Sequence, residues 1–481
     1  MTPPLIRSSS LMKRHKRLTA GLIVVVLLGL LGWRARHRIR RMFSVAAAQQ
    51  KLVGLAITPD HSPPQSAAPP VEINESDWPW WRGAHHDNHA TGPLPPLTWS
   101  ETENILWKTA IPGSGHSSPC LLGNQVFLTT AVEDQKSLLA ICLDRDSGAT
   151  VWSQQIHQGE LIHRNLKNSH ASSTPATDGQ HVFVLFAIDG SIWLSSLTRE
   201  GKLVWQREVG PYVSKEGFGA SPLIADDFVI VAADNVSQSW IAAVHRITGE
   251  IAWRVPRGPG TSYASPTLTT DDQDQDLVLI AGLNRVTAMR SQDGSEAWKI
   301  DGPDLSASTP VVGDGMLFVT SCTQDSGVFG IRLSDPPETV WKLPLKVEVP
   351  SPLYGDGLIY FAQDLGVLMC CESKTGATVW KKRLGSTISA SPVLIGDRIL
   401  VALEDGRTFV LRAGREYEVL AENSVECDGL YATPSISRGQ IFLRTVGHLY
   451  GIGTGETPLS SKPERAPPIE PQGAEVAHDS P

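Results

Sequence analysis

The residues best equipped for chemistry lie in the longest irregular stretch of the repeated part of the chain, Ser153 to Thr174. It collects imidazole, amide and basic side chains: His157, His163, Arg164, Asn165, Lys167 and His170. Loops of this kind carry function more often than strands do, so we predict a hydrogen-bonding loop. The candidate binding residues in it are His163, Arg164, Lys167 and His170. A metal site at His163 and His170 is the alternative, although no ligand spacing typical of a metal site supports it.

Two other clusters could in principle bind or react. His85, His86 and His89 lie close together, but without the spacing that places ligands on one face of a helix, so we predict no metal there. Cys370 and Cys371 lie within an apolar strand pattern, where successive side chains face opposite sides. The chain has no CxxC pair, nucleophile elbow, phosphate-binding loop or recognisable pair of carboxylates. We therefore assign no catalytic residue.

A repeat of roughly forty to fifty-five residues organises the chain, a period typical of repeat architectures. Eight times a small residue is followed by Ser or Thr and then by Pro119, Pro175, Pro222, Pro266, Pro310, Pro352, Pro392 or Pro434. Within residues 390–417 one repeat shows three short strands separated by tight turns, and the next strand, which bears a tryptophan, makes four. Radial stacking of four-stranded sheets covers their faces and protects their edges, which predicts a β-propeller.

A tryptophan marks the fourth strand of most repeats. The seven tryptophans are Trp107, Trp152, Trp205, Trp253, Trp298, Trp341 and Trp380. Leu420 takes this place in the remaining repeat. In five repeats a glycine precedes the tryptophan by four residues, where it supplies the positive φ of a tight turn. We predict a structural docking role, in which each indole packs against the neighbouring sheet.

The ends of the repeated region predict how the ring closes. The last repeat, residues 437–452, has no tryptophan strand after it, and the first such strand, residues 104–109, precedes any complete repeat. An N-terminal strand that completes the last sheet removes both defects. We therefore predict an all-β protein with an eight-bladed β-propeller, four-stranded antiparallel blades and closure by an N-terminal strand. In such a ring Arg164, Lys167 and Tyr263 are candidates at the rim of the axial funnel.

The N-terminus differs from the rest of the chain in charge and hydropathy. Residues 1–51 contain eleven basic and no acidic residues, which leaves 31 basic and 50 acidic residues, a net charge of −19, for the remainder. This excess of acidic residues argues against nucleic-acid binding, because the phosphates of nucleic acids are also negatively charged. Leu18 to Trp33 is uncharged and mostly apolar, which predicts one N-terminal transmembrane helix, a cleavable signal peptide being the alternative. Basic residues flank both ends equally, so the short N-terminus alone favours a propeller outside the cytoplasm, on the periplasmic side.

These patterns divide the chain into five segments. Stretches rich in Pro, Ala and Ser cannot bury enough apolar surface to fold. The predicted segments are a basic N-terminal segment (1–17), a transmembrane anchor (18–33), a basic and then Pro/Ala/Ser-rich linker (34–76), the β-propeller (77–455) and a disordered tail (456–481).

The tryptophan segments resemble the docking motif of the pyrroloquinoline-quinone-like (PQQ-like) β-propeller repeat family, which runs Ala-x-Asp-x-x-Thr-Gly-Lys-x-x-Trp. LDRDSGATVW ends at Trp152, and AVHRITGEIAW ends at Trp253 with His245 in place of the acidic residue. The segment from Asp77 to Gly83, DWPWWRG, is similar to the opening of planctomycete-type members. The chain thus looks like a membrane-anchored member similar to the propeller lipoprotein of the barrel-assembly machinery.

The resemblance implies two functional classes. Quinoprotein dehydrogenases of the family hold PQQ and calcium at the axis, with a vicinal disulfide against the quinone. The barrel-assembly lipoprotein uses the same repeats to bind proteins without a cofactor. Cys370 and Cys371 lie mid-strand rather than at the axis, and the short repeats leave little room for the insertions that build a cofactor pocket. We therefore expect no cofactor, with PQQ and calcium as the alternative.

We predict a membrane-anchored, extracytoplasmic propeller that acts as a protein-binding scaffold. Its expected partners are a protein and, through the N-terminal helix, the membrane. A PQQ-dependent alcohol or sugar oxidoreductase and a carbohydrate-binding propeller remain alternatives. Acidic and amide side chains that converge on the axis would favour an enzyme, whereas an apolar rim would favour a scaffold, because exposed apolar patches mark partner sites.

Overall fold

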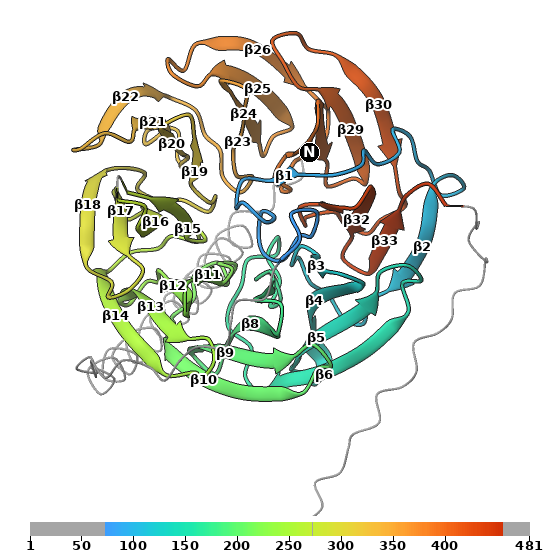
Figure 1. Ribbon diagram of the computed structural model, residues 1–481, viewed down its shortest axis with the longest axis horizontal. Coiled ribbons are helices and arrows are strands. Elements are labelled where there is room, and N and C mark those ends of the chain that lie inside the picture. Colours follow the sequence, from blue (N-terminus) through green and yellow to red (C-terminus); the bar gives the residue numbers. More distant parts are fainter. Residues whose placement is uncertain (1–72, 272, 456–481) are drawn as a thin grey trace, which may run out of the picture. The chain divides into compact units, whose positions relative to one another are not determined.

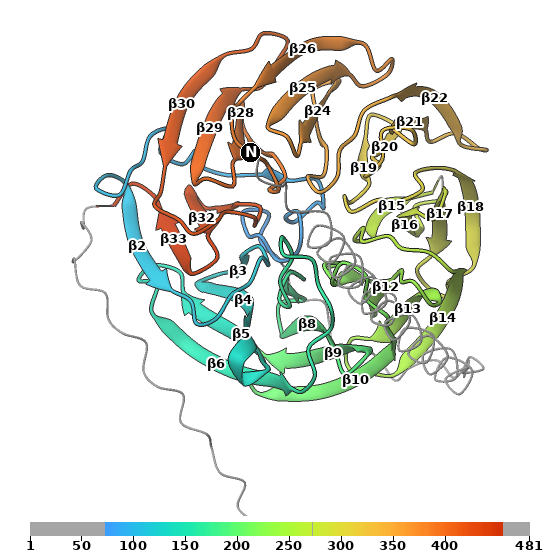
Figure 2. The same cartoon turned by 180° about the vertical axis from the view of Figure 1, so that it is seen from behind.

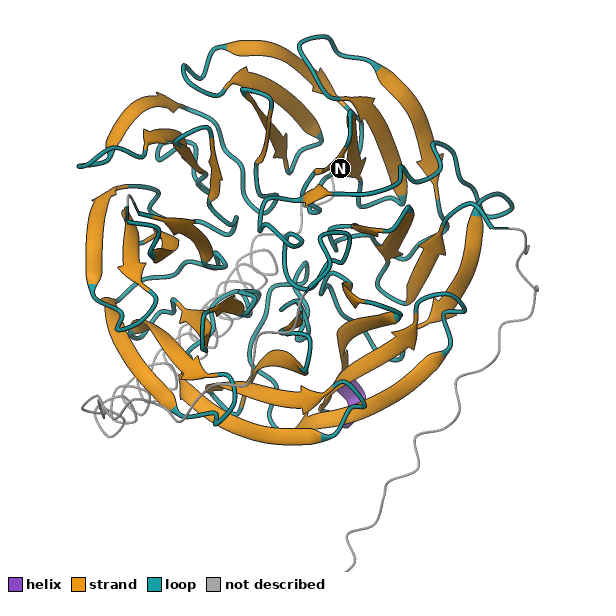
Figure 3. Ribbon diagram, in the orientation of Figure 1, coloured by secondary structure: helices purple, strands orange, loops and turns teal. Residues whose placement is uncertain are grey.

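The computed structural model describes residues 73–271 and 273–455, which form an eight-bladed β-propeller (Figure 1). The blades follow one another around the axis in chain order, and the ring seen from behind shows β2 beside β33, where it closes (Figure 2). Loops and turns converge on the axis (Figure 3). Within the described residues the helical content is one 3-10 turn, η1 (Glu133–Gln135). The predicted eight blades of four antiparallel strands are thus confirmed.

The strands of the first four blades are numbered outwards from the axis. Blade 1 has β3 (Cys120–Leu122), β4 (Gln125–Val132), β5 (Ser137–Asp144) and β6 (Thr150–Gln158). Blade 2 has β7 (Ala176–Thr177), β8 (His181–Ile188), β9 (Ser191–Thr198) and β10 (Leu203–Pro211). Blade 3 has β11 (Leu223–Ala225), β12 (Phe228–Ala233), β13 (Ser239–His245) and β14 (Ile251–Gly258). Blade 4 has β15 (Thr267–Thr270), β16 (Asp276–Gly282), β17 (Arg285–Arg290) and β18 (Glu296–Asp301).

The second half of the ring repeats this order and ends on the closing blade. Blade 5 has β19 (Val311–Gly313), β20 (Met316–Val319), β21 (Val328–Arg332) and β22 (Glu338–Leu343). Blade 6 has β23 (Leu353–Gly355), β24 (Leu358–Gln363), β25 (Val367–Glu372) and β26 (Thr378–Arg383). Blade 7 has β27 (Val393–Ile395), β28 (Arg398–Ala402), β29 (Arg407–Arg412) and β30 (Val419–Ser424), and β1 (His89–Ala90) adds to its inner edge. Blade 8 has β31 (Ser435–Ser437), β32 (Gln440–Arg444), β33 (His448–Ile452) and β2 (Ile105–Ala110).

Burial follows the position of a strand within its blade. All seven residues of β13 are buried, because a middle strand packs on both faces against neighbouring blades. The outermost strand β26 instead exposes Lys381, Lys382 and Arg383, charges that protect an unpaired edge from further strand pairing. The core therefore lies between the blades, as a series of apolar layers.

The tryptophan of one blade packs on the glycine of the next. The indole N–H of Trp107 donates to the carbonyl oxygen of Arg145 at 2.8 Å. Gly148 has φ +70°, and a Cβ atom there would lie 2.5 Å from the Trp107 ring. Glycine is thus required twice at this position, for the turn and for the close approach. Gly201, Gly249, Gly294 and Gly376 pack in the same way on the tryptophan of the preceding blade.

The N-terminal strand closes the ring as predicted. β2 pairs in antiparallel fashion with β33, with Lys108 opposite Tyr450 and Ala110 opposite His448. The last blade thus takes three strands from the C-terminal end of the propeller and one from its beginning. This pairing satisfies the edge that blade 8 would otherwise expose.

One part of the predicted fold needs correction. The prediction of one N-terminal transmembrane helix, residues 18–33, falls outside the described residues, and so do the linker before residue 73 and the tail 456–481. Across residues 73–271 and 273–455, no helix has the length and apolar character needed to cross a membrane. This part of the chain folds entirely as short strands and turns, so the fold is assigned without that helix.

Candidate functional site at the propeller axis

The Ser or Thr of the repeated Ser/Thr-Pro motif links neighbouring blades at the axis. The hydroxyl oxygen of Thr174 accepts a hydrogen bond from the backbone N–H of Ser118 at 2.9 Å, and that of Ser221 accepts from Thr174 at 3.0 Å. Four further bonds join Ser221 to Ser265, Thr309 to Ser351, Ser351 to Ser391 and Ser391 to Thr433. We call these eight motif residues the hydroxyl belt. Each oxygen that accepts in this way keeps its own proton to donate.

Residues 76–90, here called the strap, cross the axis of the propeller (Figure 1). The backbone N–H of Thr177 donates to Pro79 at 2.9 Å, Arg82 donates to the carbonyl of Pro352 at 3.1 Å, and β1 pairs with β27. These partners of the strap are either a motif proline or residues that follow a motif proline in the sequence. Each belt residue, in contrast, comes directly before its proline. The strap therefore closes the central channel on the side toward which the inner strands run.

Trp81 and Arg82 fix the strap at the axis. The indole N–H of Trp81 donates to the hydroxyl oxygen of Thr309, a belt residue, at 2.7 Å. The Arg82 side chain is fully buried and also donates to the carbonyl of His86 at 2.9 Å. Burial lowers the pKa of Arg82 to about 10. Trp81 thereby becomes part of the floor of the space above it.

A pocket of about 300 Å³ occupies the axis above the strap. Its floor contains Trp81 and seven of the eight belt residues, all except Ser351. Its walls are formed by His116, Asn165, Lys167, Asn168, Ser172, Glu216, Gly219, Tyr263, Ala307, Glu348, Val349, Asp364, Ser389 and Tyr431. The volume lies at the lower end of the range for small-ligand sites, and every blade contributes to it.

Three carboxylates line the walls. Glu216 and Glu348 have side chains that are 39% exposed, and each lies beside a half-exposed lysine. Asp364 accepts from the backbone N–H groups of Glu348 at 2.7 Å and Val349 at 3.2 Å. Burial raises the pKa of Asp364 to about 6, and the Glu348 carboxylate adds to this rise. No ion pair with Asp364 occurs among the described residues.

A fourth carboxylate joins two sides of the pocket mouth. Lys167 Nζ lies 3.0 and 3.2 Å from the two carboxylate oxygens of Glu404, and the Ser389 hydroxyl donates to Glu404 at 2.7 Å. Lys167 belongs to the long loop between blades 1 and 2, whereas Glu404 lies in the turn between β28 and β29 of blade 7. The loop is also held at Asn165, whose amide donates to Glu216 at 3.1 Å. The long loop therefore reaches across the mouth.

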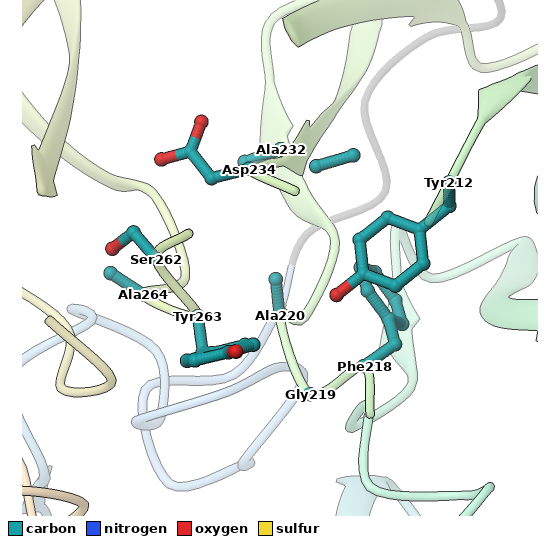
Figure 4. A pocket seen from close by; sticks show the side chains of 10 residues that line it. Tyr212, Phe218, Gly219, Ala220, Ala232, Asp234, Ser262, Tyr263 and Ala264 are labelled. Atoms are coloured by element: carbon teal, nitrogen blue, oxygen red, sulfur yellow. The ribbon is translucent and has the colours of Figure 1, made fainter. Parts of the chain in front are cut away.

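Aromatic rings form the remaining wall. The His116 and Tyr431 rings lie 4.4 Å apart, and burial lowers the pKa of His116 to about 3, which keeps its imidazole neutral at neutral pH. Burial also raises the pKa of Tyr263 to about 12. Behind Tyr263 a cavity of about 10 Å³, also lined by Tyr212 and Asp234, has room for about one water (Figure 4).

Two of the five predicted binding residues line the pocket. Lys167 enters it from the long loop, and Tyr263 enters it from the loop that precedes blade 4. The structure thus brings these two residues to one site at the axis.

The other three predicted residues lie away from the pocket lining. Arg164 donates to Glu133 at 2.7 Å and to the carbonyl of Asn168, so it braces the long loop from behind. His170 lies 3.9 Å from Glu133, and burial lowers its pKa. His163 offers its backbone carbonyl to the Ser214 hydroxyl.

One position of the repeat lines the pocket in every blade, and the sequence analysis did not identify this position. The residue three places before each motif proline lines the pocket in all eight blades: His116, Ser172, Gly219, Tyr263, Ala307, Val349, Ser389 and Tyr431. Because side chains alternate along extended backbone, this position and the belt position face the same way. Counting back from each proline would therefore have found most of the site. Trp81 and Asp364 lie outside this pattern.

The other residue clusters noted in the sequence lie elsewhere. Cys370 and Cys371 are free thiols on opposite faces of β25, in different apolar layers. The His86 ring stacks on Trp80 at 5.0 Å, and His89 hydrogen-bonds to a backbone carbonyl of blade 6. In the part of the chain that the structure describes, no group of three or more His, Cys, Asp or Glu side chains is arranged to hold a metal ion.

Comparison with known sequences gives a consistent match. The family model described as outer membrane protein assembly factor BamB matches residues 97–212, 237–335 and 330–415, which is more than half of the chain. The BamB protein of Yersinia pestis is 21% identical over 378 residues, covering 73% of this chain and 89% of that relative. The resemblance to PQQ-like repeats noted above is thereby confirmed.

Solved structures match the same fold. BamB of Moraxella catarrhalis matches with a TM-score of 0.55 and 17% identity, over 73% of this chain and 99% of that chain. A europium-containing methanol dehydrogenase matches with 0.61 and 11%, over 79% and 98%. The quinohemoprotein alcohol dehydrogenase of Comamonas testosteroni matches with 0.60 and 12%, over 87% and 86%. At these identities the likeness establishes the propeller fold alone, because one fold hosts many functions.

Proposed function

We propose that this chain, which belongs to the PQQ-like repeat family described as outer membrane protein assembly factor BamB, is a protein-binding scaffold that works outside the cytoplasm. The name of the family and of its Yersinia pestis relative refers to the assembly of outer membrane proteins. Family membership supports the proposed class of function, and the composition of the surface around the axial pocket supports it as the proposed docking surface.

The observation that carries this proposal is an apolar rim around the pocket mouth. Leu166 is 95% exposed, Leu365 is 72% exposed and Val349 is 46% exposed. Val349 lines the pocket itself, and the two leucines are the chain neighbours of the lining residues Lys167 and Asp364. Large apolar side chains left in water at one mouth, around a polar centre, have the composition of a partner site.

Site-specific crosslinking tests this docking surface. With a photoreactive amino acid in place of Val349 in the full chain, we expect crosslinks to a defined protein partner. Leu166→Asp combined with Leu365→Asp should lower the crosslink yield about tenfold, because each charge opposes the burial of the rim. Leu203→Asp provides the matched control, since Leu203 is 52% exposed on the outer strand β10. Equal loss in both variants, or no loss in either, would contradict the proposed surface.

The pocket does not fit the quinone cofactor of the dehydrogenase relatives. PQQ is a polycarboxylate, but the walls carry Glu216, Glu348 and Asp364, and the lysine among them, Lys167, is paired with Glu404. Within the described residues no group of three or more His, Cys, Asp or Glu side chains is arranged to hold a metal ion such as calcium. Cys370 and Cys371, the candidates for a lid disulfide, lie in the blade rather than at the axis. We therefore propose a scaffold without this cofactor.

A further inference from the structure

We infer that the axial pocket is a socket for one cationic side chain, a lysine or an arginine, that a protein partner presents on an exposed segment. This inference rests on the proposed scaffold function and names the chemistry that the pocket recognises. The observations that support it are the charge of the walls, a buried hydroxyl without a hydrogen-bond partner, the aromatic surfaces and a lysine of the chain itself.

The walls hold more negative than positive charge. Glu216, Glu348 and Asp364 line the pocket, whereas the basic lining residue is Lys167. Lys215 and Lys346 approach Glu216 and Glu348, but these pairs are half-exposed and contribute little. Asp364 is less exposed to solvent and forms no ion pair within the described residues, although Lys346 contributes positive charge near it. An incoming cation would therefore supply the missing partner of a carboxylate that is already held in place by two backbone N–H groups.

A buried hydroxyl without a hydrogen-bond partner lies beside the pocket. Ser118 is 2% exposed and lines the pocket floor, and its hydroxyl has no hydrogen-bond partner among the described residues. Unsatisfied buried polar groups are costly, so such groups in a cavity indicate a ligand or water that completes them. A hydroxyl oxygen accepts readily from an ammonium or guanidinium N–H.

The aromatic residues suit a cation with an apolar stem. Trp81 forms part of the floor, and Tyr431 and Tyr263 form part of the walls. A cation over an aromatic face is attracted by the ring, most strongly over tryptophan. The methylene groups of lysine and arginine pack on such surfaces while the charged end reaches the carboxylates.

The chain already places one cation at this mouth. Lys167 reaches Glu404, whose side chain is 12% exposed, from the opposite side of the opening. The Lys167 side chain is 59% exposed, so water or another cation can reach this pair. The pair is an internal example of the contact that we infer for the partner, and Lys167 competes with an incoming cation for the same part of the pocket.

A titration with small probes tests the socket directly. The probes are Nα-acetyl-arginine methylamide and its citrulline counterpart, which has nearly the same shape but no charge. Added to the full chain and followed by calorimetry or by NMR, the arginine probe should bind at least about fivefold more tightly than the citrulline probe, since charge-assisted hydrogen bonds are the stronger ones. Equal binding of the two probes, or no binding of either at millimolar concentration, would overturn the inference.

Variants locate the binding within the pocket. Asp364→Asn and, separately, the more exposed Glu348→Gln should each weaken the arginine probe about fivefold. Lys167→Met should strengthen it a few-fold by removing the internal competitor. Glu338→Gln is the control, because Glu338 is 62% exposed on the outer strand β22 and should change nothing. Loss of affinity in the control, or unchanged affinity in both pocket variants, would place the cation elsewhere.

The experiments can reject the cation socket and the scaffold proposal independently of each other. Leu166→Asp with Leu365→Asp removes the apolar rim but leaves the pocket carboxylates, so the arginine probe should still bind while the partner crosslink is lost. If the crosslink depends on the rim but the probe does not bind, the scaffold proposal stands and the socket is wrong. If the probe binds and the crosslink does not depend on the rim, the socket stands and the docking surface is wrong.

Discussion

Asp364 is the pocket residue whose protonation changes near neutral pH. Its ionisable neighbours are Glu348, Lys346 and Cys322, and burial is the main cause that raises its pKa to about 6. In the unfolded chain an aspartate titrates near pH 4. Between these values the native state holds a proton that the unfolded state has released. The contribution of Asp364 to stability is therefore complete at low pH and falls as the pH rises from about 4 through 6.

Asp364→Asn should remove this component of the pH dependence. We expect the free energy of unfolding of the variant, relative to the parent, to rise by about 2 kcal/mol between pH 4.5 and pH 7.5. Urea denaturation at several pH values measures this difference. Asp397→Asn, at a side chain that is 56% exposed, should show no comparable rise. A difference between Asp364→Asn and the parent that stays constant with pH would refute the assignment.

A comparison of two glycine-to-alanine substitutions separates the cost of the backbone conformation from the cost of lost packing against tryptophan. Gly148 and Gly315 have φ values of +70° and +69°, but a Cβ atom at Gly148 meets the Trp107 ring at 2.5 Å, whereas one at Gly315 meets nothing within 4 Å. Alanine should cost about 1 kcal/mol at either position for its backbone conformation. Gly148→Ala should cost about 1–3 kcal/mol more, because the next blade can no longer approach the indole. Equal destabilisation of both variants in urea unfolding would argue against the docking contact.

At the scale of single residues, more of the pocket lining could have been predicted from the sequence than the five candidate residues that we named. Lys167 and Tyr263 were found from loop composition and repeat topology, but the position three before each proline also identifies Tyr431 and His116. Asp364 could not be found in this way, because it lies in a turn between β24 and β25 and reaches the pocket by a contact with Glu348. Trp81 reaches it through a hydrogen bond to a residue 228 positions away, a separation that no local pattern encodes.

Among the elements, β2 has the largest consequence for the fold, because it joins the two ends of the ring. A disulfide between Ala110→Cys and His448→Cys, which lie directly opposite each other in β2 and β33, would link nearly the whole propeller into one loop. The chain-entropy relation gives about 6 kcal/mol of stabilisation for so long a loop. Urea unfolding with and without reductant, together with faster migration of the oxidised chain on a denaturing gel, measures it.

A short loop provides the comparison for this disulfide. Val367→Cys and Arg383→Cys lie opposite each other in β25 and β26 and should stabilise by about 3 kcal/mol, because their loop is much shorter. If Ala110→Cys and His448→Cys do not oxidise in the folded chain, the predicted pairing of the N-terminal strand is absent.

The strands were predictable because the same local sequence signals recur in all eight repeats. Gly396 and Asp397 mark a hairpin turn, and the strands on either side of it, β27 and β28, pair as this turn requires. The strap was not predictable in the same way. Its course depends on contacts such as that of Arg82 with Pro352, which are 270 residues apart, and its sequence has no strand or helix period.

For the whole molecule, the strap makes the axial channel open on one side. Trp81 and the hydroxyl belt form the floor, so a ligand or a partner can enter the pocket from the face that carries Leu166, Val349 and Leu365. The polar pocket and the exposed apolar residues therefore lie at the same mouth of the channel. Converging acidic and amide groups were expected to favour an enzyme, and an apolar rim to favour a scaffold. The propeller has both, so charge and fit to a cofactor must decide between the two functions.

Titration with PQQ makes that decision for the intact protein. A quinone with several carboxylates would have to sit beside Glu216, Glu348 and Asp364, while the nearest cation, Lys167, is held by Glu404. We therefore expect PQQ with calcium to leave the absorption spectrum of the quinone unchanged, and to produce no dye reduction with methanol or glucose. The double variant Glu348→Gln with Asp364→Asn has less negative charge in the pocket and serves as the control. Weak quinone binding by this variant would show that charge repulsion prevents binding in the parent. A spectral change in the parent that saturates at one equivalent and is lost in Trp81→Ala would instead establish the axis as a cofactor site, because Trp81 is the aromatic surface at its floor.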